Sequence, residues 1–385
     1  MRAIALLGWL LLSACSSVSL NPTEWFGRGS PGPKMADLPE LKDAVPVTTL
    51  WHANVGAAGN SVFFPAIAGG AVFAAAADGT VARFDIATGS QAWRAKPSGS
   101  LSGGVGADGT LAVVGTGEGE VIALSADKGE VKWRARVSSE VLAAPVMAGD
   151  IVLVRSSDSR VFALDATDGR RRWVYQRTAP NLTVRSPVGV VAVRGFVYAG
   201  FPGGKLVALS LSNGGVRWEG TVALPKGATE LERVSDVVGL PQAVGREICA
   251  VAYQGRIACF DIANGNPLWS REMSSTAGLG VDSRFVFVSD DKGTIFALDR
   301  SGGTSVWKQD RLFHRKLTAP LPLGREVAVA DVQGFVHFLA RDTGSFVGRA
   351  ATDGSPVLAS PVQLDTGKFL IQTRNGALHA MAVRQ

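Results

Sequence analysis

The side chains best suited to chemistry in this chain of 385 residues are three cysteines and four histidines. A thiolate can act as a nucleophile, form a disulfide or bind a metal, and an imidazole can move protons or bind a metal. No two histidines have the helical spacing of a metal site, and no cysteine lies near one. We therefore expect no catalytic residue and no metal. The four histidines are His52, His314, His337 and His379.

Cys249 and Cys259 flank the turn residues Gln254 and Gly255 and are expected on paired antiparallel strands. An oxidising compartment would permit a disulfide between them. Their relative orientation depends on the turn, because a strict two-residue turn would place them on opposite faces of the sheet. A disulfide and two buried thiols both remain open.

The third cysteine, Cys15, follows a short apolar segment. Residues 3–12 are apolar after Met1 and Arg2, and ten residues are too few to cross a hydrocarbon core, which needs a helix of roughly 20. Such a segment is typical of a secretion signal.

The sequence Leu12-Ser13-Ala14-Cys15 resembles a bacterial lipobox. The resemblance implies cleavage before Cys15 and attachment of diacylglycerol to its sulfur; the alternative is a signal with an incidental cysteine. Ser16 at the next position resembles the pattern of lipoproteins that are sorted to the outer membrane. We expect a signal peptide at 1–14 and a lipidated N-terminus with a flexible tether at 15–46, anchored to the outer membrane and facing the periplasm.

Two further features could indicate ligands. Residues 104–109 match the dinucleotide fingerprint, but strands flank the match and no helix follows, so we interpret it as a glycine-rich turn. The formal charge of +6 could indicate a nucleic-acid partner. However, the longest basic run is Arg170–Arg172, which directly precedes the core-like Trp173, and we expect no nucleic-acid binding.

The elements that would position these residues follow a repeat of about 40 residues. Each copy has a turn glycine, a strand ending in Ala-Leu-Asp or a similar sequence, a second glycine ten residues on, and a tryptophan four further. Such spacing fits four short strands per unit. The tryptophans are expected to pack between neighbouring units, and they are Trp93, Trp133, Trp173, Trp218, Trp269 and Trp307.

The two ends of the chain complete one unit. The seventh copy has Gly348 in place of the tryptophan, and the eighth, from Asn375-Gly376, is cut short by the C-terminus. Its missing strand is available at residues 47–51, which end in Trp51. A repeat broken at one end and completed at the other predicts a closed ring. We predict an all-β fold, an eight-bladed β-propeller of four-stranded antiparallel blades at 47–385, closed by an N-terminal strand that completes the last blade.

One copy illustrates the expected blade. In the third, residues 143–146 are expected to form the inner strand, followed by a turn at 148–150 and strands at 151–154, 161–165 and 172–175. Small alanine and glycine residues suit the crowded region near the axis of a ring.

The pattern resembles the propeller repeat of pyrroloquinoline-quinone proteins, with its Ala-Leu-Asp, Thr-Gly and Trp residues, from 47 to 385. That resemblance specifies a fold and not a function. It makes a quinone-dependent periplasmic dehydrogenase the enzymatic alternative. Alcohol-oxidising members carry adjacent cysteines and Asp, Asn and Glu ligands for calcium. This chain has no adjacent cysteines and no Cys-x-x-Cys-His motif, so we expect no cofactor.

Two consecutive units are longer than the rest. Trp173 to Trp218 is 45 residues and Trp218 to Trp269 is 51. Insertions in repeat arrays usually lie on the binding face. The extra residues include the segments 181–186 and 229–236, in which aliphatic residues stand beside arginine, a common composition of binding hot spots.

The segment 229–237, Thr-Glu-Leu-Glu-Arg-Val-Ser-Asp-Val, resembles the BamB family of lipoproteins of the outer-membrane barrel assembly machine. The resemblance implies that the loops leading into blades 4 and 5 contact the polypeptide-transport-associated domains of BamA. It carries four candidate contacts over to this chain: Leu182, Val184, Arg185 and Asp236. Family members often have a second acidic residue where this chain has Val238, so an ionic contact there is in doubt.

The resulting hypothesis is a non-catalytic scaffold that binds BamA and assists insertion of β-barrel precursors, which the scaffold could itself contact. The alternatives are the quinone-dependent dehydrogenase and a propeller that binds another envelope protein. The sequence does not indicate which precursors depend on it.

Overall fold

The computed structural model describes residues 34–41 and 44–383. The predicted signal peptide and the lipidation site Cys15 lie outside the described residues. From Ala36 onward the chain forms one unit, and no described helix has the length and apolar character of a membrane span.

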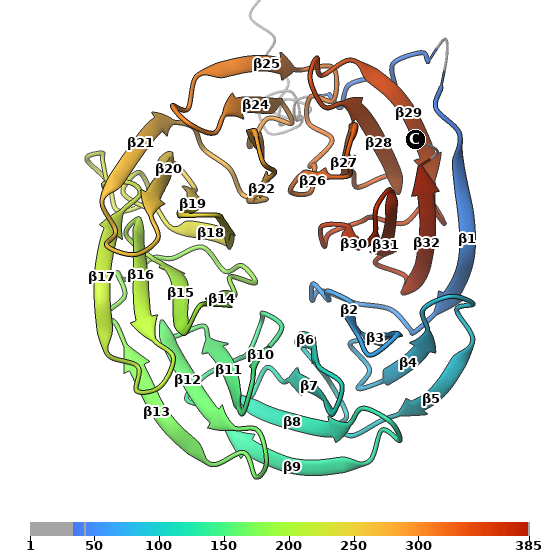
Figure 1. Ribbon diagram of the computed structural model, residues 1–385, viewed down its shortest axis with the longest axis vertical. Coiled ribbons are helices and arrows are strands. Elements are labelled where there is room, and N and C mark those ends of the chain that lie inside the picture. Colours follow the sequence, from blue (N-terminus) through green and yellow to red (C-terminus); the bar gives the residue numbers. More distant parts are fainter. Residues whose placement is uncertain (1–33, 42–43, 384–385) are drawn as a thin grey trace, which may run out of the picture. The chain divides into compact units, whose positions relative to one another are not determined.

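The described residues form eight four-stranded antiparallel sheets arranged as the blades of a ring (Figure 1), which confirms the predicted propeller. Blades 1 to 4 comprise β2 (Ala66–Ala68), β3 (Ala71–Ala75), β4 (Val81–Asp85) and β5 (Gln91–Ala95); β6 (Gly103–Ala107), β7 (Leu111–Gly115), β8 (Glu120–Ser125) and β9 (Val131–Arg136); β10 (Val146–Ala148), β11 (Ile151–Ser156), β12 (Arg160–Asp165) and β13 (Arg171–Gln176); β14 (Val190–Val193), β15 (Phe196–Phe201), β16 (Lys205–Ser210) and β17 (Val216–Thr221).

Blades 5 to 8 continue in the same order, from the inner strand to the outer strand. They comprise β18 (Val237–Val244), β19 (Glu247–Ala252), β20 (Arg256–Asp261) and β21 (Pro267–Glu272); β22 (Leu279–Val281), β23 (Phe285–Ser289), β24 (Ile295–Asp299) and β25 (Ser305–Gln309); β26 (Leu321–Pro322), β27 (Glu326–Ala330), β28 (Phe335–Ala340) and β29 (Phe346–Ala351); β30 (Val362–Asp365), β31 (Lys368–Gln372), β32 (Ala377–Val383) and β1 (Val47–Asn54).

The ring closes as predicted, because the first strand of the chain is the outer strand of the last blade. β1 pairs antiparallel with β32, with Ala53 opposite Leu378 and a bulge between Thr49 and Trp51. Because β1 supplies the fourth strand of the last blade, all eight described blades are complete. The closed ring has no terminal blade with a face left open, as an open array would.

The repeated tryptophans lie between neighbouring blades and join them. Each indole nitrogen donates a hydrogen bond of 2.7–3.1 Å to a backbone carbonyl of the next blade. The indole also covers the second glycine of the next blade's repeat. A Cβ atom added to Gly303, for example, would lie 2.4 Å from the Trp269 indole. This contact requires glycine, which explains the fixed Gly-to-Trp spacing. The seven indoles are those of Trp51, Trp93, Trp133, Trp173, Trp218, Trp269 and Trp307.

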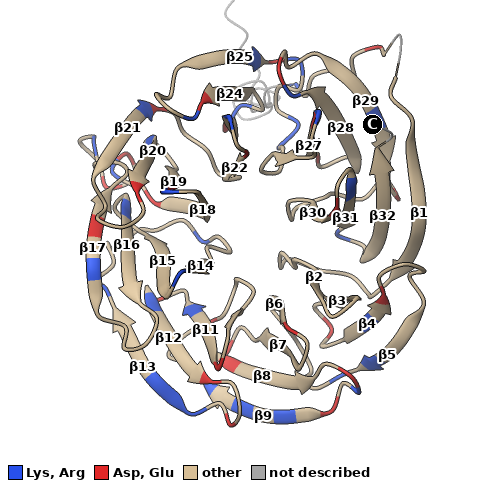
Figure 2. Ribbon diagram, in the orientation of Figure 1, with Lys and Arg blue, Asp and Glu red and all other residues tan. Residues whose placement is uncertain are grey.

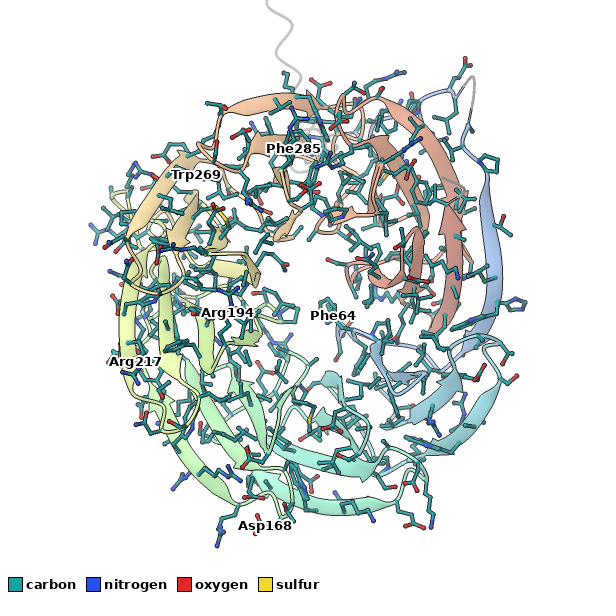
Figure 3. All side chains as sticks on the ribbon, viewed as in Figure 1. Phe64, Asp168, Arg194, Arg217, Trp269 and Phe285 are labelled. Atoms are coloured by element: carbon teal, nitrogen blue, oxygen red, sulfur yellow. A yellow bond between two sulfur atoms is a disulfide. The ribbon has the colours of Figure 1, made fainter. Side chains whose placement is uncertain are left out.

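The interior is formed by apolar clusters that each span two adjacent blades. Figure 3 shows Trp269 and Phe285 within this wall, Asp168 and Arg217 at its outer edge, and Phe64 beside the central channel. The channel has a volume of about 1300 Å³ and is lined by the inner strands and the loops beside them.

Charged residues gather on the outer strands, most visibly on β9 and β13 (Figure 2). Charges on an edge strand discourage pairing with another chain. The inner strands carry few charged residues, because these strands face the channel and the inner strands of the neighbouring blades.

One predicted blade differs from the observed one at its inner strand. β10 starts at Val146, whereas we predicted a strand over 143–146 and a turn from 148. Pro145 has no backbone N–H to donate to a ladder, so pairing with β11 begins only after it.

Blades 7 and 8 meet without a tryptophan, and the N-terminal segment runs along blade 7 instead. The amide of Val45 donates to the Val347 carbonyl at 2.6 Å, beside Gly348. Further upstream, Arg315 donates to the Ala36 carbonyl at 2.8 Å and Arg349 to the Pro39 carbonyl at 2.6 Å. The part of the expected tether after residue 35 is therefore attached to the ring.

Those two arginines belong to a buried cluster, the blade 7 cluster, made of Arg315, Asp331, His337 and Arg349. Asp331 accepts hydrogen bonds from Arg315 at 2.6 Å and shares one of 2.9 Å with His337. Burial lowers the pKa of His337 despite the Asp331 carboxylate beside it, which favours a neutral imidazole. The cluster connects the N-terminal segment to the core of the blade.

Candidate docking surface on blades 3 to 5

The two longest connections between described blades lie next to each other on the ring. The blade 3/4 loop comprises residues 177–189 and the blade 4/5 loop residues 222–236. Each leads from an outer strand to the inner strand of the next blade, so both lie on the same face, which we call the inter-blade face. This is where the unequal repeat lengths predicted insertions.

The tip of the blade 4/5 loop is fixed by its own side chains. The Glu232 carboxylate accepts hydrogen bonds from the amides of Ala228 and Thr229 at 2.8 and 3.1 Å, and the Thr229 hydroxyl accepts one from the Glu232 amide. This is the reciprocal arrangement of a capping box. The turn presents Leu231, which is 69% exposed.

Leu182 projects from the neighbouring loop and is 46% exposed. Val184, two residues further, is partly buried. The two loops thus present separate aliphatic side chains, and Leu224 of the blade 4/5 loop is exposed as well. Contiguous exposed apolar patches mark interaction sites more reliably than single exposed residues, so the docking role of these leucines remains a proposal.

Arg185 is the most exposed charged group of the blade 3/4 loop, with 63% of its side chain accessible. Its guanidinium makes a bidentate ion pair with Glu140, with N–O distances of 3.1 and 2.9 Å. The hydrogen bonds to Glu140 raise the pKa of Arg185. Glu140 precedes blade 3, so this pair joins the loop to the preceding blade and holds Arg185 in one orientation.

Asp236 was predicted as a partner contact, but its side chain is only 4% exposed. Its two carboxylate oxygens accept hydrogen bonds from the amides of Val184 at 2.6 Å and Gly203 at 3.2 Å. Burial raises the pKa of Asp236, and those amides oppose the shift. The geometry gives Asp236 the role of joining the two loops, rather than that of a surface contact. Val238, on β18, is likewise buried.

Beneath the loops lies a cavity of about 250 Å³, which we call the Arg155 pocket. Arg155 reaches it from β11, with its guanidinium 4.4 Å from the centre of the Phe201 ring and a hydrogen bond to the Gly200 carbonyl. Burial lowers the pKa of Arg155 to about 10, and the charge of Asp236 opposes this effect. The pocket is also lined by Glu140, Ser157, Val184, Arg185, Ser186 and Asp236.

Sequence reasoning did not identify Arg155 or Glu140. Both occupy ordinary positions of the repeat, Arg155 near the end of a strand and Glu140 in a connection of normal length. Their partners are 45 residues away, at Gly200 and Arg185. These groups come close together only when three neighbouring blades have assembled.

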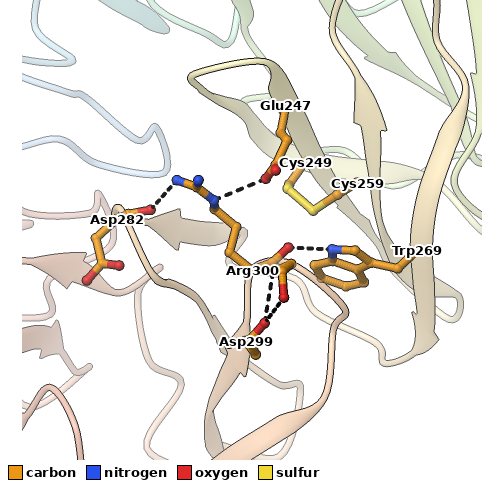
Figure 4. Close-up of a disulfide and its surroundings, with 8 residues drawn as sticks. Glu247, Cys249, Cys259, Trp269, Asp282, Asp299 and Arg300 are labelled. Carbon is orange, nitrogen blue, oxygen red and sulfur yellow. Dashed lines mark hydrogen bonds and ion pairs between the residues drawn. A yellow bond between two sulfur atoms is a disulfide. The ribbon is translucent and has the colours of Figure 1, made fainter.

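Cys249 and Cys259 lie away from this surface and form a disulfide (Figure 4). They are directly opposite each other on β19 and β20, because the intervening turn has three residues, 253–255, and not two. Their side chains therefore share a face. On the neighbouring blade, Arg300 makes an ion pair of 3.1 Å with Glu247, and its carbonyl accepts the indole N–H of Trp269.

The described channel residues differ from the adjacent cysteines and calcium ligands that the quinone-dehydrogenase resemblance implies. The two cysteines are joined across a hairpin and do not line the channel. Three aspartates line the channel: Asp282 is paired with Arg341 at 2.6 Å, Asp290 accepts backbone amides, and Asp291 accepts the Ser274 hydroxyl. The described residues contain no group of three or more acidic, histidine or cysteine side chains that could hold a metal.

The chain is similar in sequence to one family of known proteins. A family model described as outer membrane protein assembly factor BamB matches residues 43–101 and 77–309. The chain is 43% identical to the protein of that name from Bordetella pertussis, over 98% of this chain and 95% of the relative. It is 40% identical to the one from Burkholderia pseudomallei, over 97% of this chain and 96% of the relative.

Solved structures share the propeller fold of this chain. The crystal structure of BamB from Moraxella catarrhalis matches with a TM-score of 0.81 and 29% identity, covering 88% of this chain and all of that one. A quinohemoprotein alcohol dehydrogenase from Comamonas testosteroni matches with a TM-score of 0.68 at 13% identity, covering 88% of this chain and 76% of that one. The second match concerns the fold alone.

Proposed function

The chain belongs to the BamB family of outer membrane protein assembly factors, and from this membership we propose that it works as a non-catalytic scaffold in the assembly of outer-membrane β-barrels. The observation that carries the proposal is the joining of the two longest inter-blade loops through Asp236. A surface whose loops are already fixed loses little conformational entropy when a partner binds.

The partner we propose is BamA, bound through its polypeptide-transport-associated domains. The inter-blade face offers three exposed leucines and the oriented guanidinium of Arg185; the leucines are Leu182, Leu224 and Leu231. Aliphatic contacts around an oriented arginine suit a compact protein surface. Val184 and Asp236 would support this contact from below.

We also propose that Cys15 carries the lipid anchor, which would hold the propeller at the outer membrane on its periplasmic side. The support is the lipobox-like sequence at 12–15 together with the disulfide of Cys249 and Cys259, which suits an oxidising compartment. Unfolded barrel precursors are a further candidate partner.

Co-purification with BamA tests the docking surface. Arg185→Glu should weaken the complex by about 2 kcal/mol or more, a typical loss at a binding hot spot, because it reverses the charge at the exposed tip of the loop. Arg170→Glu is the control, since Arg170 is exposed on the C-terminal side of another turn and has no side-chain partner among the described residues. Equal recovery of BamA with wild type and Arg185→Glu would contradict the assigned face.

A further inference from the structure

We propose that the Arg155 pocket receives a carboxylate side chain of the docking partner, so that Arg155 is a binding residue and not only a structural one. The inference rests on the proposed docking function and adds the chemistry of the group that enters the surface. Three features support it: the balance of donors and acceptors, the engagement of the two local acids, and the size of the cavity.

Most hydrogen-bond donors of Arg155 have no acceptor among the described residues. A guanidinium has five N–H groups and no acceptor, and the only hydrogen-bond acceptor of Arg155 among the described residues is the Gly200 carbonyl. The Ser186 hydroxyl, which also lines the pocket, is buried and has no partner in that part of the chain. A partly buried guanidinium with so few acceptors is costly unless another group supplies them.

The two acids that line the pocket are already engaged. Glu140 uses both carboxylate oxygens for Arg185. Asp236 uses both of its oxygens for the amides of Val184 and Gly203. Asp236 therefore interacts with Arg155 only through its charge. A group that has only acceptors, such as an ionised Asp or Glu side chain, would complete the coordination of Arg155.

The size and position of the pocket favour a side chain over a free small molecule. Its volume of about 250 Å³ lies below the range of roughly 300–1,000 Å³ that is usual for small-molecule sites. Its lining includes Val184 and Arg185 of the docking surface. A partner resting on Leu182 and Arg185 could insert one side chain between the loops without a further conformational change.

Two substitutions separate the role of Arg155 in binding from any role in folding. Arg155→Met retains an apolar stem over Phe201 but removes every donor, and Arg155→Lys retains the charge but not the planar fork. With purified BamA, Arg155→Met should weaken binding about thirtyfold or more, as expected when one member of a buried charge pair is lost. Arg155→Lys should bind with intermediate affinity. Amide exchange at Val184 should be unchanged in both, which shows that the loops remain joined.

A scan of BamA identifies the group that enters. Each exposed Asp and Glu of its polypeptide-transport-associated domains is changed to Asn or Gln and titrated against wild type and Arg155→Met. One acid should weaken binding to wild type and have no further effect with Arg155→Met, which is the signature of a direct pair. If every acid acts additively with Arg155→Met, or if Arg155→Met binds as wild type does, the pocket holds only water and the inference is wrong. Failure of wild type to bind BamA would instead contradict the proposed function.

Discussion

The amide of Val184 donates a hydrogen bond of 2.6 Å to the carboxylate of Asp236, which lies 52 residues further along the chain. The second oxygen of the same carboxylate accepts the amide of Gly203 at 3.2 Å. One buried side chain thus joins two long loops and a turn of the blade between them. The arrangement of the two loops therefore depends on a side chain that is itself buried.

Asp236→Asn should loosen these loops while leaving the ring intact. The amide has a single acceptor oxygen, so the N–H of Val184 or of Gly203 loses its partner, at a cost of about 1–3 kcal/mol for a buried donor. Hydrogen exchange should accelerate at these two amides and not at the β1–β32 pair. Asp168→Asn is the control, because Asp168 accepts a single exposed amide, that of Arg170. Unchanged protection of Val184 would contradict this role of Asp236.

Exchanging the charges of Glu140 and Arg185 should separate folding from docking. Glu140→Arg combined with Arg185→Glu can restore the ion pair, and an exposed pair contributes only about 0.2–1 kcal/mol to stability. The double variant should therefore unfold at nearly the wild-type urea concentration. It should still fail to bind BamA, because the exposed tip of the blade 3/4 loop carries the wrong sign. Recovery of binding in the double variant would show that Arg185 acts only through Glu140.

Trp51→Ala should weaken the closure of the ring. Trp51 is buried, donates to the Ile86 carbonyl at 2.9 Å and covers Gly89 of the first blade. Loss of a buried tryptophan costs about 3–5 kcal/mol. The amides of β32 should lose protection before those of blades 3 to 5. Leu50→Ala is the matched control, since Leu50 lies beside Trp51 with its side chain exposed, and that variant should behave like wild type.

The blade 7 cluster should make the protein less stable in mild acid. Burial lowers the pKa of His337 in the folded protein, whereas the unfolded chain titrates near 6.5. Above that pH both states are neutral and stability is full. As the pH falls below it, only the unfolded state takes up the proton, and stability decreases by at most about 1.4 kcal/mol per pH unit. The facing charges of Arg315, Asp331 and Arg349 remain in place.

Urea unfolding at pH 7, 6 and 5 provides the measurement. His337→Gln, which retains hydrogen-bonding capacity for Asp331, should lose less stability than wild type over this interval. His314→Gln, at a partly exposed histidine in the connection between blades 6 and 7, is the control for the loss of one imidazole. Parallel curves for wild type and His337→Gln would show that the imidazole is not the group responsible.

The fold could be predicted because its signals reside in residues with strict local requirements. Gly303 must leave room for Trp269, and Trp51 completes a blade whose other strands lie at the far end of the chain. The two long loops with aliphatic residues and an arginine were also predicted, and their role in docking stays a prediction. Burial of Asp236 and the contacts of Arg155 could not be predicted, because each depends on backbone groups that only the assembled blades bring within reach.

The pairing of β1 with β32 also has a temporal consequence. β1, which closes the ring, precedes all other described strands in the chain, and its partner β32 follows them. Until β32 is available, β1 has no strand to pair with and the ring stays open. Contacts of such long sequence separation form late and slowly. During that interval the growing arc exposes strands that could associate with the wrong neighbours. Anything that shields β1 until β32 is available would therefore help the protein to mature.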